Sequence, residues 1–130
     1  MVLQEVFGID PHIKKVTENF AAQGYVAIAP ALFDRVKKNV ELGYDEAGLA
    51  AGLDLKSQVE IGDAIADIQA AVDAVKDTGK VAIVGYCWGG YLAYLSANKV
   101  GGLACVEGSP MCPRRSGKFQ PCSISARKIR

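Results

Sequence analysis

Apolar residues follow two alternating patterns along the first hundred positions of the chain. Short apolar runs are typical of buried strands, and they occupy residues 1–7, 25–29, 80–84 and 102–106. Between these runs, apolar residues recur every three or four positions over 11–23 and, most regularly, over 59–76, which predicts amphipathic helices. Strands that alternate with helices predict an α/β fold with a mostly parallel sheet and helices on both of its sides.

Turn and capping residues mark the ends of several predicted elements. Asp10 and Pro11 are expected to be the N-cap and the first residue of a helix that Gly24 ends. Residues 44–57 predict a short helix weakened by two internal glycines. The run 80–84 is uniformly apolar after its lysine, which is typical of a strand covered on both faces.

Length and composition indicate one globular domain at most. The chain has 130 residues, of which 50% are hydrophobic and 22% are charged, and this balance excludes wholesale disorder. The longest uncharged stretch, residues 81–98, contains three glycines and is not a membrane span. Residues 1–5 have no basic, apolar pattern of a secretion signal, so we expect a cytoplasmic protein without a membrane partner.

Charge divides the chain into two parts. Residues 1–110 have 14 acidic and 9 basic side chains, whereas residues 111–130 have 6 basic side chains and no acidic one. We therefore expect a partial domain over 1–106 and a basic, unstructured tail over 107–130. Phe119 is the one aromatic residue in that tail, so we do not expect a nucleic-acid partner.

The cysteines do not form a metal-binding or redox pattern. No two of them are spaced as Cys-x-x-Cys, and the single histidine, His12, is far from all of them in sequence. We therefore expect no metal, no organic cofactor and no disulfide. The four cysteines are Cys87, Cys105, Cys112 and Cys122.

The most informative segment joins the apolar run 80–84 to a predicted helix through Gly85-Tyr86-Cys87-Trp88-Gly89. A nucleophile elbow has this form: the nucleophile lies on a strained strand-to-helix turn, and small residues on both sides let the turn close. The helix N-terminus directs backbone N–H groups at the thiol and favours the thiolate. A dinucleotide-binding turn would need glycine where Cys87 stands. The remaining alternative is an inert cysteine in an ordinary tight turn.

Four segments together resemble the dienelactone hydrolase (carboxymethylenebutenolidase) family, the cysteine-nucleophile branch of the α/β-hydrolase fold. The resemblance covers about residues 2–105, and the segments occur in the order and at the separations of that family. They are Gln4-Glu5-Val6-Phe7-Gly8, Gln23-Gly24-Tyr25-Val26-Ala27, Pro30-Ala31-Leu32-Phe33 and Gly85-Tyr86-Cys87-Trp88-Gly89-Gly90.

The resemblance implies a catalytic site at Cys87 and Glu5. Cys87 would be the nucleophile, Glu5 would take part in activating it, and the backbone N–H groups of Val6 and Trp88 would form the oxyanion hole. The residues agree, because a carboxylate within an apolar run is costly unless it is hydrogen-bonded or functional. The alternative for Glu5 is the exposed end of a strand.

Several features depart from the family pattern. The family completes its triad with an Asp and a His downstream of the elbow, but residues 88–130 contain neither. His12 falls at a helix start and is expected to be a partly exposed capping residue. The first strand lacks a beginning, and the likeness ends near residue 106. We therefore expect the central strands and helices of an α/β-hydrolase, truncated at both ends, with impaired activity.

These observations leave three functional hypotheses. The first is a hydrolase that cleaves a small-molecule lactone or ester through Cys87. The second is a non-catalytic fragment or pseudoenzyme that self-associates through exposed sheet edges. The third is a redox-sensitive thiol protein. Nearby cations could anchor an anionic substrate or could form a solvated surface loop; they are Arg35, Lys37 and Lys38.

Overall fold

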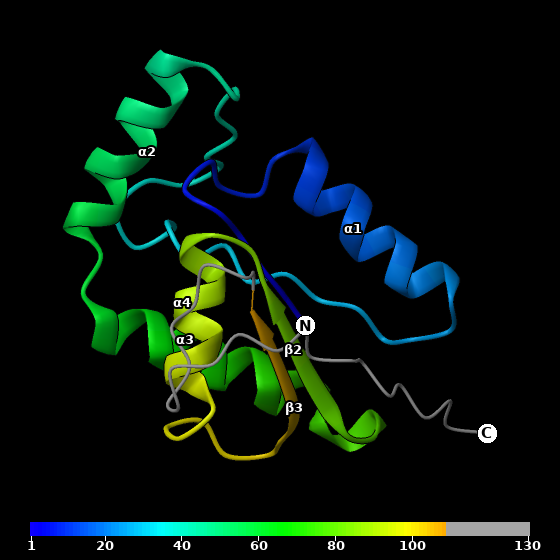
Figure 1. Cartoon of the computed structure of the whole chain (residues 1–130). Helices are drawn as coiled ribbons and strands as arrows, with labels where there is room; N and C mark the ends of the chain where they lie inside the picture. Colours follow the sequence, from blue (N-terminus) through cyan, green and yellow to red (C-terminus); the bar gives the residue numbers. More distant parts are fainter. Residues whose placement is uncertain (109–130) are drawn as a thin grey trace, which may run out of the picture.

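A three-stranded parallel sheet forms the centre of the structure. The computed structural model describes residues 1–108, with side chains through residue 103. The sheet consists of β1 (Val2–Leu3), β2 (Val81–Gly85) and β3 (Leu103–Gly108), in the order β1-β2-β3. β2 and β3 lie side by side in Figure 1. The predicted α/β fold with a parallel sheet is confirmed. β3 continues two residues past the expected boundary at 106, and the basic segment 109–130 lies outside the described residues.

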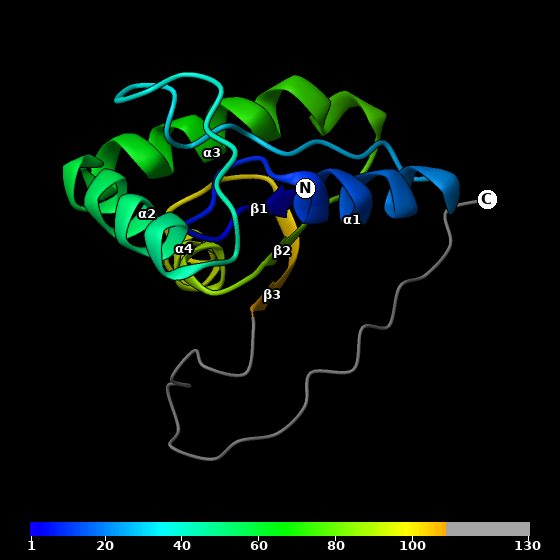
Figure 2. The ribbon, with the colours of Figure 1, turned by 90° about the horizontal axis from the view of Figure 1, so that it is seen from above.

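Four α-helices and one 3₁₀ turn surround the sheet. α4 packs on one face and contacts all three strands, and α3 packs against α4. α1 contacts β1 and lies on the opposite side of the sheet from α4 (Figure 2). The bounds are α1 (Pro11–Ala22), α2 (Glu46–Gln58), α3 (Ile61–Val75), η1 (Lys76–Thr78) and α4 (Trp88–Ser96).

The first helix begins and ends as the sequence predicts. The Asp10 carboxylate accepts a hydrogen bond from the Ile13 N–H at 2.8 Å, and Pro11 is the first helical residue. Past the last turn, Gly24 has φ +91°, a left-handed conformation that favours glycine. Capping by these residues fixes where the chain enters α1 after the loop that contains Glu5.

Residues 25–29 do not form the predicted strand. One backbone hydrogen bond, from Val2 N–H to the Ile28 carbonyl at 2.8 Å, joins this extended segment to β1. Val26 is 60% exposed, so the segment has neither a full ladder nor a covered face. The apolar run alone predicted the strand wrongly, because a strand also needs a partner along its length.

The second strand is covered on one face and not on two. Val81 and Ile83 are buried, whereas Ala82 between them is exposed and Val84 is half-buried. Since α4 packs across one face and Ala82 is exposed, the other face of β2 remains accessible among the described residues. β1 and β3 are the outer strands of this sheet, and self-association through them stays a prediction.

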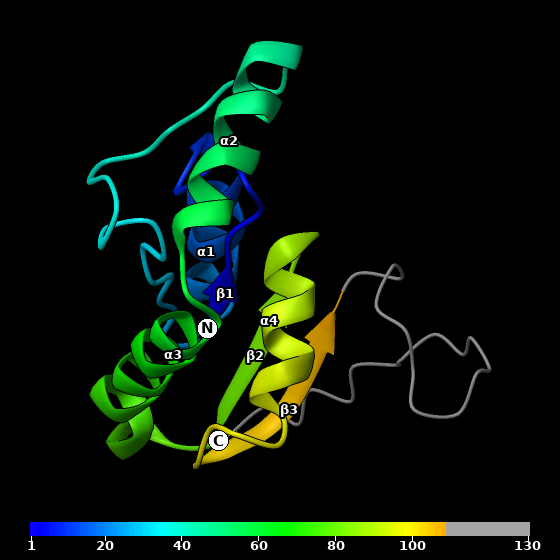
Figure 3. The same ribbon diagram turned by 90° about the vertical axis from the view of Figure 1, so that its left-hand side faces the viewer.

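The two glycines of α2 allow close packing. α2 has 13 residues, and Gly48 and Gly52 are both buried. A Cβ at Gly52 would lie 3.0 Å from the carbonyl carbon of Val6 and closer still to its oxygen. Gly52 therefore lets α2 pack directly on the backbone that follows β1. Figure 3 shows α2 extending past the end of the sheet where β1 and β2 finish.

Candidate active site

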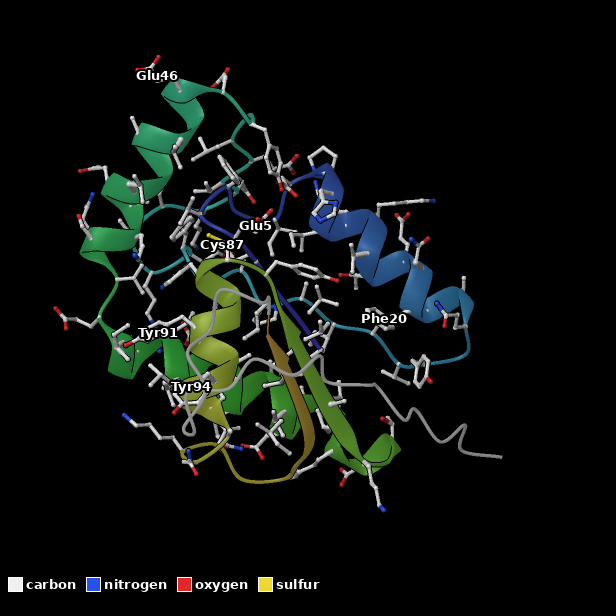
Figure 4. All side chains as sticks on the ribbon, in the orientation of Figure 1. Glu5, Phe20, Glu46, Cys87, Tyr91 and Tyr94 are labelled. Atoms are coloured by element: carbon white, nitrogen blue, oxygen red, sulfur yellow. The ribbon has the colours of Figure 1, made fainter. Side chains whose placement is uncertain are left out.

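Glu5 and Cys87 lie at the same end of the sheet. β1 and β2 are parallel neighbours, and Leu3 is paired with Gly85. Glu5 and Cys87 each follow their strand's paired residue by two positions, so the parallel register brings them to corresponding places. Figure 4 shows both side chains at this end, above α4. The carboxyl ends of parallel strands are where α/β proteins usually build their sites.

Cys87 occupies the tip of a strained turn between β2 and α4. Its backbone has φ 51° and ψ −114°, and it is the N-cap of α4. Few residues other than glycine adopt a positive φ, so the turn holds Cys87 in a costly conformation. The Cys87 carbonyl accepts the Tyr91 N–H at 3.2 Å, which begins the helix directly at the turn. The thiol is free and exposed.

The two glycines beside Cys87 are required by contacts with backbone atoms. A Cβ at Gly85 would lie 2.7 Å from the Gly90 nitrogen and closer still to the Gly89 carbonyl. A Cβ at Gly89 would lie 2.5 Å from the carbonyl oxygens of both Leu3 and Gln4. Gly85 therefore closes the turn, and Gly89 lets α4 pack against the end of β1.

The Trp88 side chain is part of the packed core. The indole is 4% exposed and stacks on Phe33, with 5.2 Å between ring centroids. The hydrogen bonds among residues 1–108 include none from the N–H of Trp88 or from that of Val6. Val6 follows Glu5 and Trp88 follows Cys87 directly in the chain, and their role as oxyanion-hole donors stays a prediction.

Glu5 is held by a tyrosine that the sequence analysis did not identify. Its side chain is half-buried, and its Oε2 accepts a hydrogen bond from the Tyr44 hydroxyl, 39 residues away. The Tyr44 ring packs on Phe7, with 4.2 Å between centroids. Tyr44 lies in a loop before α2, where neither spacing nor hydrophobic pattern relates it to Glu5.

A second carboxylate lies close to the same hydroxyl. Asp10 is fully buried, and its Oδ2 has no hydrogen-bond partner among the described residues. Burial of the hydroxyl, and then the neighbouring carboxylates of Glu5 and Asp10, raise the pKa of Tyr44 well above its usual range. Tyr44 is consequently a neutral donor at physiological pH, even though much of its ring is exposed.

Gln4 fixes the backbone immediately before Glu5. It is fully buried; its Oε1 accepts the Leu32 N–H at 3.0 Å, and its Nε2 donates to the Glu5 carbonyl at 3.3 Å. In the sequence, Gln4 was expected only as part of the family resemblance. A buried amide within an apolar run was the signal that could have indicated this role.

His12 lies near the site without capping the helix. Asp10 is the N-cap, and His12 is an exposed residue of the first turn. The imidazole meets Tyr86 edge-on at 5.9 Å and Tyr44 at 6.5 Å between centroids. The expected capping role of His12 is therefore wrong, because the neighbouring aspartate supplies the cap.

Arg35 stabilises the loop and is not a free substrate anchor. Its guanidinium donates to both oxygens of Asp67, at 2.7 and 2.9 Å, and lies 3.5 Å from the Asp63 carboxylate. These contacts join the loop after residue 30 to α3. The charge of Arg35 is thus matched by two carboxylates.

A cavity within residues 1–108 does not have Cys87 in its lining. It has a volume of about 340 Å³ and lies behind Gln4. Lys14, a cation at its wall, is paired with Glu41. Neither Cys87 nor Glu5 lines this cavity, so it is not part of the candidate site; its other walls include Gly8, Ala31, Phe33, Asn39 and Val40.

Two kinds of feature are absent from the described part of the chain. There, no three His, Cys, Asp or Glu side chains are grouped so that they could hold a metal ion. No helix within residues 1–108 is long and apolar enough to cross a bilayer. The expected cytoplasmic location stays a prediction.

A parallel sheet with a strand–cysteine–helix turn at its carboxyl end defines an α/β-hydrolase-type domain. The chain belongs to the dienelactone hydrolase family, whose model matches residues 1–108. The family predicted from the four sequence segments is confirmed.

Curated relatives agree with this assignment. A putative carboxymethylenebutenolidase of Synechocystis sp. is 38% identical over 103 residues, which cover 75% of this chain and 42% of that protein. A carboxymethylenebutenolidase of a Pseudomonas species is 34% identical over 111 residues, which cover 82% of this chain and 47% of that protein. The chain therefore spans about half the length of these relatives.

Proposed function

We propose that the chain is a hydrolase of the dienelactone hydrolase type that cleaves a small-molecule lactone or ester through Cys87. The observation that supports this most is the exposed Cys87 thiol on a strained turn at the N-terminus of α4. The carboxyl end of β1 presents Glu5 at the corresponding position. Relatives described as carboxymethylenebutenolidases support the substrate class.

In the proposed acylation, the Cys87 sulfur attacks the carbonyl carbon of the substrate. The carbonyl oxygen becomes an oxyanion, which accepts hydrogen bonds from the N–H groups of Val6 and Trp88. Collapse of this intermediate breaks the ester C–O bond and forms a thioester on Cys87. The leaving enol or alcohol takes the proton that the thiol gave up, and water then cleaves the thioester to a carboxylic acid and the free thiol.

Glu5 is proposed to receive the thiol proton when the substrate is bound. If its carboxylate turned to the thiol with no substrate present, the negative charge would oppose formation of a second negative charge on sulfur. No metal or organic cofactor enters these steps.

Hydrolysis of the thioester is the step that we propose to be impaired. A water molecule needs a general base to attack the thioester efficiently, and the base would be a histidine oriented by an aspartate. Residues 88–130 contain neither His nor Asp. Acylation of Cys87 is accordingly expected to outpace release of the acid.

The test is acylation by p-nitrophenyl acetate, with mass spectrometry of the whole 130-residue chain and of its peptides. We expect about one acetyl group per chain, located on Cys87, to accumulate before product release. The Cys87→Ala variant should lose this label, whereas Cys105→Ala should retain it. Equal acetylation of the wild-type and Cys87→Ala chains would refute the proposed nucleophile.

The same experiment separates the alternative functions. A chain that takes no acetyl group, but whose Cys87 is oxidised selectively by dilute peroxide, would be a redox-sensitive thiol protein. A chain that does neither would be a non-catalytic fragment or pseudoenzyme.

A further inference from the structure

The Tyr44 hydroxyl interacts with two carboxylates, those of Glu5 and Asp10, and has one proton to donate. It donates that proton to Glu5. Asp10, fully buried, uses Oδ1 to cap α1 and leaves Oδ2 without a donor among the described residues. A buried carboxylate oxygen without a donor is costly, so Asp10 is a ready second acceptor for the same hydroxyl.

We propose that Tyr44 is a positioning residue for Glu5. In the free chain the Tyr44 hydroxyl anchors the Glu5 carboxylate. When Glu5 turns to the Cys87 thiol, the hydroxyl donates its hydrogen bond to Asp10 instead. This inference rests on the proposed function, because the turn of Glu5 matters only if Glu5 activates Cys87. It adds a residue to the site that neither the elbow nor the family resemblance contains.

The geometry makes the exchange a local movement. The Tyr44 ring is confined by Phe7 on one face and meets the edge of His12, so the hydroxyl rotates while the ring stays in place. One hydrogen bond is lost at Glu5 and one is gained at Asp10. Each state leaves one carboxylate oxygen without this donor.

The charges around the hydroxyl agree with this role. Burial and both carboxylates raise the pKa of Tyr44, so its proton is retained throughout the physiological range. A phenolate could not donate to either carboxylate. The cation nearest in sequence, Lys14, is paired with Glu41 and so does not neutralise Asp10 in place of Tyr44.

The first test is the rate at which iodoacetamide alkylates Cys87 in the full chain, measured across neutral pH by mass spectrometry. Tyr44→Phe keeps the ring and removes the hydroxyl, so Glu5 is released toward the thiol. Its charge should then slow alkylation about threefold to tenfold near pH 7. The double variant Tyr44→Phe/Glu5→Gln should regain a rate at or above that of wild type.

This double variant distinguishes positioning from a loss of structure, because removing Glu5 cannot rescue a misfolded site. Tyr25→Phe is the matched control, since Tyr25 contacts Phe20 at the far end of α1 and should alkylate at the wild-type rate. Wild-type alkylation in Tyr44→Phe, or a slow rate that Glu5→Gln does not relieve, would overturn the proposal.

The second test concerns Asp10 as the alternative acceptor. Asp10→Asn keeps a side chain that caps α1 but removes the charge that attracts the hydroxyl. Alkylation of the free chain should stay within about twofold of wild type, whereas acetylation by p-nitrophenyl acetate should fall several-fold. Equal effects on both rates would remove Asp10 from the exchange. The alkylation arms need no ester cleavage, so they still test Tyr44 if the proposed hydrolase activity fails.

Discussion

The two halves of the candidate site are built in different ways. The elbow, residues 81–90, obtains its shape from neighbours in sequence, because Gly85 closes against the carbonyl of Gly89. The acid loop, residues 4–9, is held by distant segments. Leu32 donates to Gln4, Tyr44 donates to Glu5, and the Ile9 N–H donates to the Val40 carbonyl at 3.1 Å.

This difference separates two kinds of requirement. A nucleophile needs a strained backbone, and small residues a few positions apart are sufficient to permit that strain. A carboxylate near a thiol needs its charge oriented and partly neutralised, and the groups that do so can come from anywhere in the chain. The turn at Cys87 is therefore encoded mainly by nearby residues, although Gly89 also packs on the Leu3 and Gln4 carbonyls, whereas the acid loop is held by distant segments of the fold.

The largest expected effect on stability comes from adding a methyl group at Gly85 in the elbow. Gly85→Ala would place a methyl group 2.7 Å from the Gly90 nitrogen and closer still to the Gly89 carbonyl. Since both neighbours are backbone atoms that cannot move aside, we expect a loss of about 3 kcal/mol in the free energy of unfolding. Chemical denaturation monitored by circular dichroism measures this loss.

Gly62→Ala is the matched control for this variant. Gly62 lies in α3, and a Cβ there would meet nothing within 4 Å. Alanine should therefore stabilise the helix by roughly 0.5–1 kcal/mol. If Gly85→Ala were as stable as Gly62→Ala, the local account of the elbow would fail.

A smaller loss is expected when the acid loop is detached from its distant contacts. Gln4→Ala leaves the Leu32 N–H without its acceptor and opens a small cavity in the core. We expect destabilisation of about 2–3 kcal/mol, together with slower acetylation of Cys87 because Glu5 is displaced.

The control for the acid loop is Gln23→Ala. Gln23 is exposed and bonds only to the nearby Asn19 carbonyl through its side chain, so its removal should change stability by no more than about 0.5 kcal/mol. Equal stability of the two glutamine variants would show that the acid loop does not depend on Leu32.

The smallest effect should appear only at high pH. Because the folded state raises the pKa of Tyr44, its neutral phenol contributes stability that is complete below about pH 10, the usual phenol value, and is lost as the pH rises further. The free energy of unfolding of the wild type should therefore fall more steeply above that pH than the free energy of unfolding of Tyr44→Phe.

Ultraviolet titration of the tyrosine phenols measures the ionisation of Tyr44 directly. Glu5→Gln removes one carboxylate from the hydroxyl and should lower the pKa of Tyr44 toward the usual range. Identical phenol titrations of the wild-type and Glu5→Gln chains would contradict the link between Tyr44 and Glu5.

Apolar patterns predicted elements well where neighbouring residues supply the contacts. α1 and α3 agree with their helical spacing, and Asp10 and Pro11 occupy the predicted capping positions. The same reasoning gave the strand at 25–29 wrongly, and it gave β2 a second covered face that the described chain does not have. Both errors concern neighbours across space, which an apolar run cannot specify.

By itself, the sequence determined the α/β class, the family and the turn at Cys87, because repeating apolar positions and closely spaced glycines act over a few residues. Only the tertiary structure decided how Glu5 is held. Tyr44 reaches it across 39 positions of sequence, and Gln4 reaches Leu32 across 28. Hydrogen bonds over such separations depend on how the chain is packed, so no local sequence pattern predicts them.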